Sequence, residues 1–370
     1  MYIYDREDWP NFFWNNDELI GKLAALRFKQ GQLLGRMGSL GFRLQSEATL
    51  ETITEEVVKS SQIEGELLDT TLVRSSVARQ LGIALGAIPP PDRYIDGIVE
   101  MVLDATQRCD DPLTRERLFG WHSALFPGGR SGMSRIIVGD FRNDQSGPMQ
   151  VVSGPVGKQH VHFQAPPAVT INTEIEAFLD WYNRGSTADP LLKTAIAHLW
   201  FVTIHPFDDG NGRIARAIAD QALTRSEKGA QRFYSMAAQI RKDREAYYNI
   251  LETTQKGDLN ITPWIKWFLG CLESAIDGAQ TALAGTLRKA GFWQKHSDKS
   301  LNVRQRSILN RLLDGFEGKL TSSKYAKIAK CSQDTALRDI DDLIRQDILT
   351  KNRAGGRSAS YSIIETEPIP

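Results

Sequence analysis

Apolar residues recur at helical spacing along most of the chain, and this pattern predicts a mainly α-helical protein. One part departs from it. Residues 127–167 are rich in Gly and Pro and contain short β-branched runs, so we expect a loop with a short β-hairpin there. The predicted helices cover residues 17–37, 48–61, 67–86, 92–108, 114–125, 191–203, 211–226, 242–255 and 262–284.

The predicted helix at 191–203 differs from the others because it is apolar almost all round. A surface helix carries only an apolar stripe, so this one should be central and buried. Asp189 and Pro190 directly precede it and suit its N-cap and first position. We therefore expect the core of the protein to form around this segment.

The last 70 residues are predicted to be a separate small domain. Its pattern of helix, helix, helix and hairpin is the order of a winged helix-turn-helix. A polar stretch containing glycine precedes it and predicts a linker. The expected organisation is an N-terminal helical region, a central core, the linker and the small domain, over residues 1–110, 111–285, 286–300 and 301–370.

Composition narrows the class of protein without naming a partner. The 370 residues carry 45 Lys and Arg against 45 Asp and Glu, a balance that favours neither a nucleic acid nor a membrane as partner. Three widely separated cysteines form no disulfide framework. The N-terminus lacks the pattern of a signal peptide, and no apolar run is long enough for a membrane span. We expect a cytoplasmic protein.

The segment after the predicted central helix holds the candidate chemistry. Gly and Asn tolerate the backbone angles that curl N–H groups into an anion-binding nest, and a helix N-terminus adds partial positive charge. Two arginines three residues apart share a helix face and can hold phosphate oxygens. An aspartate can carry Mg²⁺, and a histidine is suited to taking a proton near neutral pH. The residues are His205, Pro206, Phe207, Asp208, Asp209, Gly210, Asn211, Gly212, Arg213 and Arg216.

This segment resembles the Fic family signature HPFx(D/E)GNGRxxR and matches it at every fixed position. The resemblance implies a helical Fic core with the loop between two central helices. It also implies transfer of AMP from ATP, with Mg²⁺, to a hydroxyl of a target protein or of the chain itself. The roles that it implies are catalytic base for His205, Mg²⁺ ligand for Asp209, phosphate cradle for Gly210, Asn211, Gly212 and Arg213, γ-phosphate ligand for Arg216, and loop anchor for Phe207.

A second short motif lies N-terminal to this segment. Ser60 and Glu64 are four residues apart on one predicted helix face, and Gly65 follows. They resemble the family's inhibitory motif (S/T)xxxE(G/N). The resemblance implies that Glu64 pairs with Arg216 and so denies the γ-phosphate its arginine. In some relatives the same glutamate serves the removal of AMP, which leaves the direction of the reaction open.

The resemblance also assigns a target-docking flap and a nucleotide-base site. The flap is the predicted hairpin, with Val161, His162 and Phe163 on its second strand, where an edge strand can add a target's chain. Tyr248 and Gln255 fall where relatives contact adenine and ribose.

His160 and His162 alternate along the second flap strand. Two histidines on one strand face can bind a metal ion, but the sequence offers no third ligand nearby, which argues against a metal site. His122 and His198 are interpreted as core or capping histidines.

The partners stay open at this stage. From 301 to 370 there are 12 Lys and Arg against 9 Asp and Glu, which is far from a strongly basic footprint. Aspartates on the presumed recognition helix would repel DNA, so protein interaction is favoured over DNA binding. Alternatives are a DNA-binding regulator that senses nucleotide, an enzyme that removes AMP, or one that transfers another phosphate-linked group. A homodimer is also left open.

Overall fold

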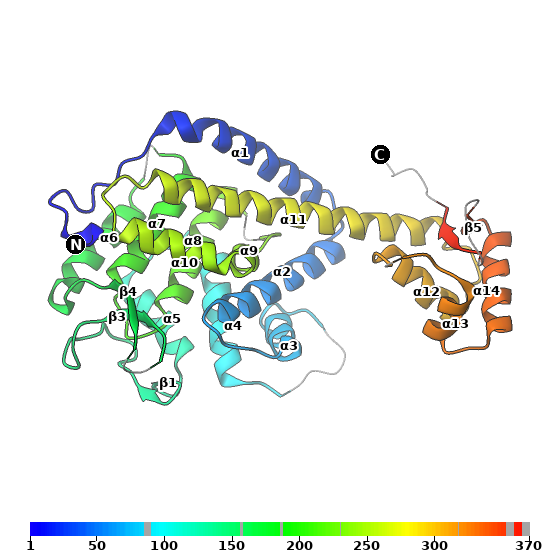
Figure 1. Ribbon diagram of the computed structural model, residues 1–370, viewed down its shortest axis with the longest axis horizontal. Coiled ribbons are helices and arrows are strands. Elements are labelled where there is room, and N and C mark those ends of the chain that lie inside the picture. The colour runs from blue at the N-terminus through cyan, green and yellow to red at the C-terminus, as the bar shows by residue number, and fades with distance from the viewer. Residues whose placement is uncertain are drawn as a thin grey trace. The chain divides into compact units, whose positions relative to one another are not determined.

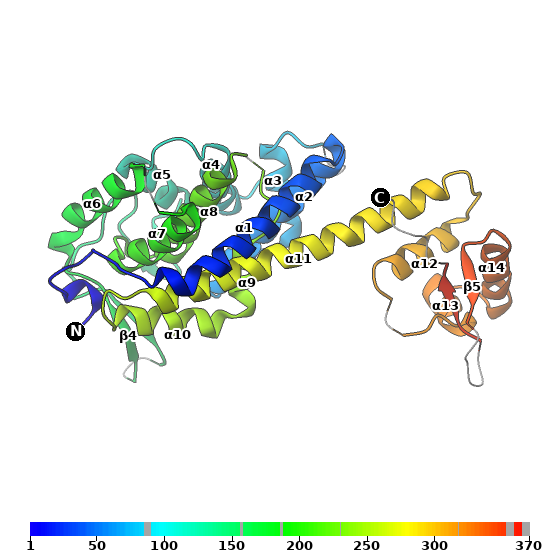
Figure 2. The same ribbon diagram turned by 90° about the horizontal axis from the view of Figure 1, so that it is seen from above.

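The computed structural model describes residues 1–84, 90–155, 158–185, 188–229, 231–316, 318–352 and 359–364. It divides into two compact units, Met1–Gly278 and Ala279–Pro370. Figures 1 and 2 show that helices dominate both units, as predicted. No helix among these residues is both long and apolar enough to cross a bilayer.

The first unit holds ten complete helices of the described chain and the start of an eleventh, α11, which crosses the division between the units. Two 3₁₀ turns, η1 (Ile3–Asp5) and η2 (Ala168–Thr170), complete it. The helices are α1 Asn16–Gly38, α2 Phe42–Ile63, α3 Thr70–Gln80, α4 Arg93–Gln107, α5 Arg115–Leu125, α6 Ile171–Asn183, α7 Pro190–Ile204, α8 Asn211–Glu227, α9 Met236–Lys242, α10 Arg244–Gln255 and α11 Thr262–Lys295.

Helix α7 is the centre of the first unit. Asp189 accepts the Leu191 N–H at 2.7 Å and caps the helix, and Pro190 occupies its first position. From Leu191 to Ile204 only Lys193 is not buried. The prediction of a buried central helix is confirmed, and α8 packs along it (Figure 1).

The N-terminal arm and α1 cover this core. Trp9 packs edge-on against Trp200 of α7, at 6.3 Å between ring centroids. Helix α1 lies beside the first half of α11 in both views of the ribbon (Figures 1 and 2). Lys29 links the two helices, because its ammonium lies 2.8 Å from both Glu273 and Asp277.

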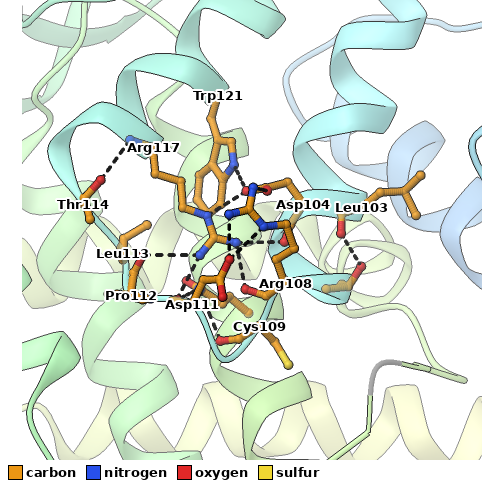
Figure 3. A network of polar contacts seen from close by, with 12 residues as sticks. Leu103, Asp104, Arg108, Cys109, Asp111, Pro112, Leu113, Thr114, Arg117 and Trp121 are labelled. Carbon is orange, nitrogen blue, oxygen red and sulfur yellow. Dashed lines mark hydrogen bonds and ion pairs between the residues drawn. The ribbon is translucent and has the colours of Figure 1, made fainter.

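Helices α4 and α5 are joined by a polar network shown in Figure 3. Arg117 donates to the Asp104 carboxylate at 2.7 Å, and Trp121 donates to the same oxygen at 2.7 Å. Arg117 also caps the carbonyls of Asp104 and Arg108. A surface cavity of about 330 Å³ lies beside this network. Asp104, Arg108 and Arg117 of its lining pair with one another, so these three side chains serve the fold.

The predicted hairpin is present as β3 (Gln150–Ser153) and β4 (His160–Gln164), which pair antiparallel with a register shift at Val151/Val152. Val156 and Gly157, between the two strands in sequence, lie outside the described residues. A smaller pair, β1 (Arg130–Ser131) and β2 (Ser134–Arg135), and helix α6 were not predicted.

The second unit has its own apolar core. Helices α12 (Val303–Leu313), α13 (Ser322–Ala329) and α14 (Gln333–Arg345) precede the antiparallel strands β5 (Leu349–Lys351) and β6 (Tyr361–Ile363). The core residues are Phe292, Ile308, Leu309, Leu313, Leu320, Tyr325, Ala336, Ile340, Leu343, Ile348, Leu349 and Tyr361.

The expected linker at 286–300 is wrong in its first ten residues, since α11 continues to Lys295. Phe292 is buried in the second unit's core, at 3% exposure. The apolar side chains at this stretch favour a packed helix, and we had given its polar residues and Gly291 too much weight.

Candidate active site

His205 ends α7 in the left-handed conformation, with φ 53° and ψ 57°. Its Nδ1 donates to the Val202 carbonyl at 3.2 Å, because a carbonyl can only accept. The ring nitrogen Nε2 therefore holds the lone pair. Burial lowers the pKa of His205 to about 4, so the ring is neutral at pH 7 and can take a proton.

The loop after His205 is fastened by the side chain of Asn211. Its amide donates to the Phe207 carbonyl at 2.8 Å, and its oxygen accepts the Phe207 N–H at 3.0 Å. Phe207 is fully buried and stacks on the His122 ring, 4.2 Å between centroids. Phe207 is thus a loop anchor, as expected. Asn211, expected to cradle phosphate, uses its side chain to shape the loop and leaves only its backbone N–H for an anion.

His122 supports the same loop from α5. Its Nδ1 accepts the Gly139 N–H at 3.2 Å, so its Nε2–H donates to the Asp209 carbonyl at 3.2 Å. Burial lowers the pKa of His122 to about 4, which keeps this arrangement neutral. The His122 ring therefore stabilises the loop, consistent with its interpretation as a core histidine.

The two aspartates of the loop have different surroundings. Asp208 accepts the Ile137 N–H at 2.8 Å and fixes the chain after β2. Asp209 keeps a side chain 42% exposed, accepts the Gly210 N–H at 2.6 Å and accepts the Ser131 hydroxyl. Its carboxylate is also 3.9 Å from the Arg213 guanidinium. Asp209 is the available oxygen ligand for a hard cation.

Arg142 is a supporting residue that the sequence did not reveal. Its side chain is fully buried and donates to the carbonyls of His205 at 2.8 Å and Pro166 at 2.6 Å. Its backbone N–H donates to the Pro206 carbonyl at 3.0 Å, and Asp144 neutralises its charge at 2.9 Å. No motif marks Arg142, because its partners are backbone atoms brought together by the fold.

Replacing Arg142 by alanine should leave these buried carbonyls without a hydrogen-bond donor and the Asp144 carboxylate without its ion-pair partner. We expect the free energy of unfolding to fall by about 2–4 kcal/mol. Urea unfolding measures it, with Arg135→Ala as a control, because Arg135 is exposed on β2 and its loss should change stability by less than about 0.5 kcal/mol. Equal stability of the two variants would contradict the role assigned to Arg142.

Two glycines shape the start of α8. Gly210 has φ +82°, and a Cβ there would come within 2.9 Å of the Phe126 ring. A Cβ on Gly212 would overlap the Glu64 carboxylate. The two glycines therefore keep side chains away from the start of α8. The first N–H groups of a helix lack intrahelical acceptors, so this is a position where an anion can bind.

Glu64 occupies that anion position. It follows α2 directly, and its Oε1 lies 2.8 Å from Arg216 Nη2. Ser60 adds two bonds to the same guanidinium, through its hydroxyl at 2.8 Å and its carbonyl at 3.0 Å. Gly65 follows at φ +89°, where α2 has ended. The structure brings together Ser60, Glu64 and Arg216, the three residues that the resemblance to the inhibitory motif predicts to interact.

The end of α2 is held by α10. Arg244 donates to the Ile63 carbonyl at 2.6 Å, and the Tyr248 hydroxyl lies 3.2 Å from Glu64 Oε2. Tyr248, which we expected to contact the nucleotide base, therefore contacts Glu64. Gln255 is buried, and its amide donates to Thr203 at 3.3 Å. This bond places Gln255 in the core beside α7.

Arg213 meets a second carboxylate that the sequence analysis missed. Its guanidinium lies 3.0 Å from Glu66 Oε2 and 3.1 Å from the Tyr94 hydroxyl. It also lies over the Phe126 ring. Within the described chain, Arg213 Nε and Arg216 Nη1 are buried without a hydrogen-bond partner. Buried donors of this kind fit a pocket that receives an anion.

The flap residues differ in exposure. Phe163 is buried at 2%, under Tyr2, whose ring is 5.2 Å away, so its side chain cannot meet a target. Val161 and His162 are only partly buried. His162 is committed to Glu252 on α10, with 2.6 Å between Nδ1 and Oε2. What remains for strand addition is the backbone of the hairpin.

Two family models match the chain. A model of the Fic/DOC family matches residues 112–223, and a domain of unknown function (DUF4172) matches residues 2–83. The first match runs from α5 into α8 and includes all of the loop described above. The second includes α1, α2 and the Glu64 segment.

Several curated relatives carry the name protein adenylyltransferase Fic. The protein from Nematostella vectensis is 32% identical over 303 residues, which cover 78% of this chain and 62% of the relative. The one from Drosophila melanogaster is 32% identical over 105 residues, 28% of this chain and 20% of the relative. The chain thus spans less than two thirds of the length of the relatives it matches.

Solved structures support the fold. A Fic family protein from Desulfovibrio desulfuricans G20 superposes with a TM-score of 0.51 at 20% identity, covering 93% of this chain and 96% of that one. A Fic domain containing signaling protein from Bacteroides thetaiotaomicron has a TM-score of 0.52 at 21% identity, covering 71% and 97%.

Proposed function

The chain belongs to the Fic/DOC family, and we propose that it is a protein adenylyltransferase held inactive by its own Glu64. The observation that carries the proposal is the Glu64 carboxylate over Gly212, bound to the buried Arg216. A carboxylate that sits on a helix N-terminus and an arginine marks a site built for an anion. The relatives are named as transferring an adenylyl group. For this chain we propose ATP as the donor, with its phosphates as the anion.

In the proposed reaction the target hydroxyl attacks the α-phosphorus of ATP, and pyrophosphate leaves with the electrons of the broken P–O bond. The hydroxyl proton passes to Nε2 of His205, whose tautomer is set by the Val202 carbonyl. The first N–H groups of α8 and the two arginines would hold the phosphates. The hydroxyl belongs to a side chain of another protein or of this chain.

Asp209 fits a Mg²⁺ ion, because its carboxylate is partly exposed and lies beside the proposed phosphate site. When bound there, Mg²⁺ would neutralise phosphate charge. Arg213 and Glu66 would have to separate for phosphate to reach the guanidinium, as would Arg216 and Glu64. Two ion pairs therefore hold the site closed in this proposal.

The test is transfer of label from α-labelled ATP into protein, using a cell lysate as the source of targets and the Glu64→Gly variant as enzyme. Labelled protein, together with release of pyrophosphate, is the expected result. Loss of label from protein that was labelled beforehand, without new labelling, would instead favour removal of AMP.

A pH prediction follows from the state of His205. Burial lowers the pKa of His205 to about 4 from the usual 6.5, and the neutral ring is the active form. The kcat/KM of the Glu64→Gly variant for ATP in excess Mg²⁺, which reports ionisations of the free enzyme, should therefore stay flat from about pH 7.5 down to about pH 5 and fall only as pH approaches 4. A fall centred near pH 6.5 would show that the ring titrates normally.

For the second unit we propose a winged helix that binds protein more readily than DNA. Asp339, which we expected to repel DNA, is buried and bound by Arg304 at 2.8 Å, so it does not face a partner. Asp334 and Asp341 remain exposed on α14 and still disfavour a phosphate backbone. Arg353 and Arg357, between β5 and β6 in sequence, lie outside the described residues. Binding of a DNA fragment at physiological salt would favour the regulator instead.

A further inference from the structure

The base of the flap joins β4 to α10 through three side chains with the chemistry of metal ligands. His160 and His162 project from one face of β4, and Glu252 faces them from α10. One ligand atom of each residue lies within 4.8 Å of the other two. The third ligand that the local sequence did not offer thus comes from another element.

We propose that His160, His162 and Glu252 form a binding site for a divalent transition-metal ion of the Zn²⁺ class. Two imidazole nitrogens and one carboxylate oxygen are donors that Zn²⁺ accepts in sites that leave a position for water. Mg²⁺ and Ca²⁺ prefer oxygen ligands alone, so this set discriminates against them. The site is separate from Asp209, and the inference does not rest on AMP transfer.

The distances require only small side-chain movements. Tetrahedral ligands about 2.0–2.1 Å from Zn²⁺ lie about 3.3 Å apart. Glu252 Oε2 is 2.6 Å from His162 Nδ1, and Oε1 is 3.8 Å from His160 Nε2, so the two separations bracket that value. His160 is exposed, and His162 and Glu252 are partly buried, which leaves room for these side chains to adjust and a path for water.

The neighbours suit this role. Ser153 Oγ lies 2.6 Å from His162 Nε2, and a proton there would leave Nδ1 free to bind the ion. Lys256 already places a cation 2.5 Å from Glu252 Oε1. Its side chain is 37% exposed and pairs weakly at such a site, so a metal ion can displace it. Bound metal would fasten the flap strand to α10.

Titration of the metal-free full chain with Co²⁺ tests the site. We expect one equivalent to bind with the visible absorption of tetrahedral coordination, Zn²⁺ to displace it, and excess Mg²⁺ to leave it in place. His160→Ala and Glu252→Gln should each weaken binding at least about 10-fold, since even outer-shell partners contribute 10- to 100-fold. Glu245→Gln, an exposed glutamate on the same helix, is the matched control and should bind normally.

Two results would overturn the site: absence of one-equivalent binding in the unmodified chain, or equal affinity in both ligand variants and the control. His160 is 66% exposed, so its alanine variant should fold even if Glu252→Gln does not. Zn²⁺ should also slow hydrogen exchange in β3 and β4 of the unmodified chain and of Glu245→Gln, and not of His160→Ala.

Discussion

Replacing His205 by alanine in the Glu64→Gly background should lower AMP transfer by about 100-fold or more. The reason is that the variant loses the uncharged ring nitrogen that takes the hydroxyl proton and becomes positively charged as it does so. The Val202 carbonyl fixes the His205 tautomer, and burial keeps the ring uncharged. The measurement is the rate of label incorporation from α-labelled ATP at saturating nucleotide.

The control for this prediction separates catalysis from folding and binding. ATP affinity should change little in the His205→Ala variant, because the phosphates are assigned to the start of α8 and to the arginines. A matched histidine change is His296→Ala in the second unit, which should leave transfer intact. If His205→Ala retains most of the rate, the histidine is not the base.

Removing the Glu64 side chain should also have a large effect: AMP transfer should rise by about 10- to 100-fold in the Glu64→Gly variant. That range corresponds to a charge-assisted hydrogen bond to a buried guanidinium, about 1.5–3 kcal/mol. Glu64 also covers the position above Gly212 where phosphate would lie. Removing the side chain therefore frees both the arginine and the space. Initial rates of labelling measure the effect.

Glu64→Gln tells these two causes apart. The amide keeps the size of the side chain and can still accept from Arg216, but it carries no charge. We expect a rate between those of the unmodified chain and Glu64→Gly. Glu51→Gln, at an exposed position of α2, should have no effect. If the Glu64→Gly variant is no faster than the unmodified chain, Glu64 does not inhibit AMP transfer.

The sequence predicted the elements whose physical cause is local. Helix α7 is apolar all round and capped by Asp189, so its burial could be read directly. Gly65 and Gly210 mark positive φ angles next to a helix end and a helix start. The linker was misjudged because burial of Phe292 depends on residues far away in sequence, beyond α12.

The sequence predicted only those residues of the site that belong to a local motif. The inhibitory motif and the loop came from adjacent residues and from resemblance to known proteins. Arg142 and Glu66 act on atoms 24 to 147 residues away, and such pairings have no local signal. Glu252 likewise reaches His162 across 90 residues. The Asn211 side chain shows a further limit, since a motif fixes a residue type without saying which of its atoms will be used.

We propose that AMP, and no other part of ATP, is moved onto a protein hydroxyl at this site. The decisive experiment gives the Glu64→Gly variant and its His205→Ala double variant either α-labelled or γ-labelled ATP with Mg²⁺. We expect protein label from the α-phosphate alone, and we expect it to be lost in the double variant. Label arriving from the γ-phosphate, or α-label that persists without His205, would contradict it.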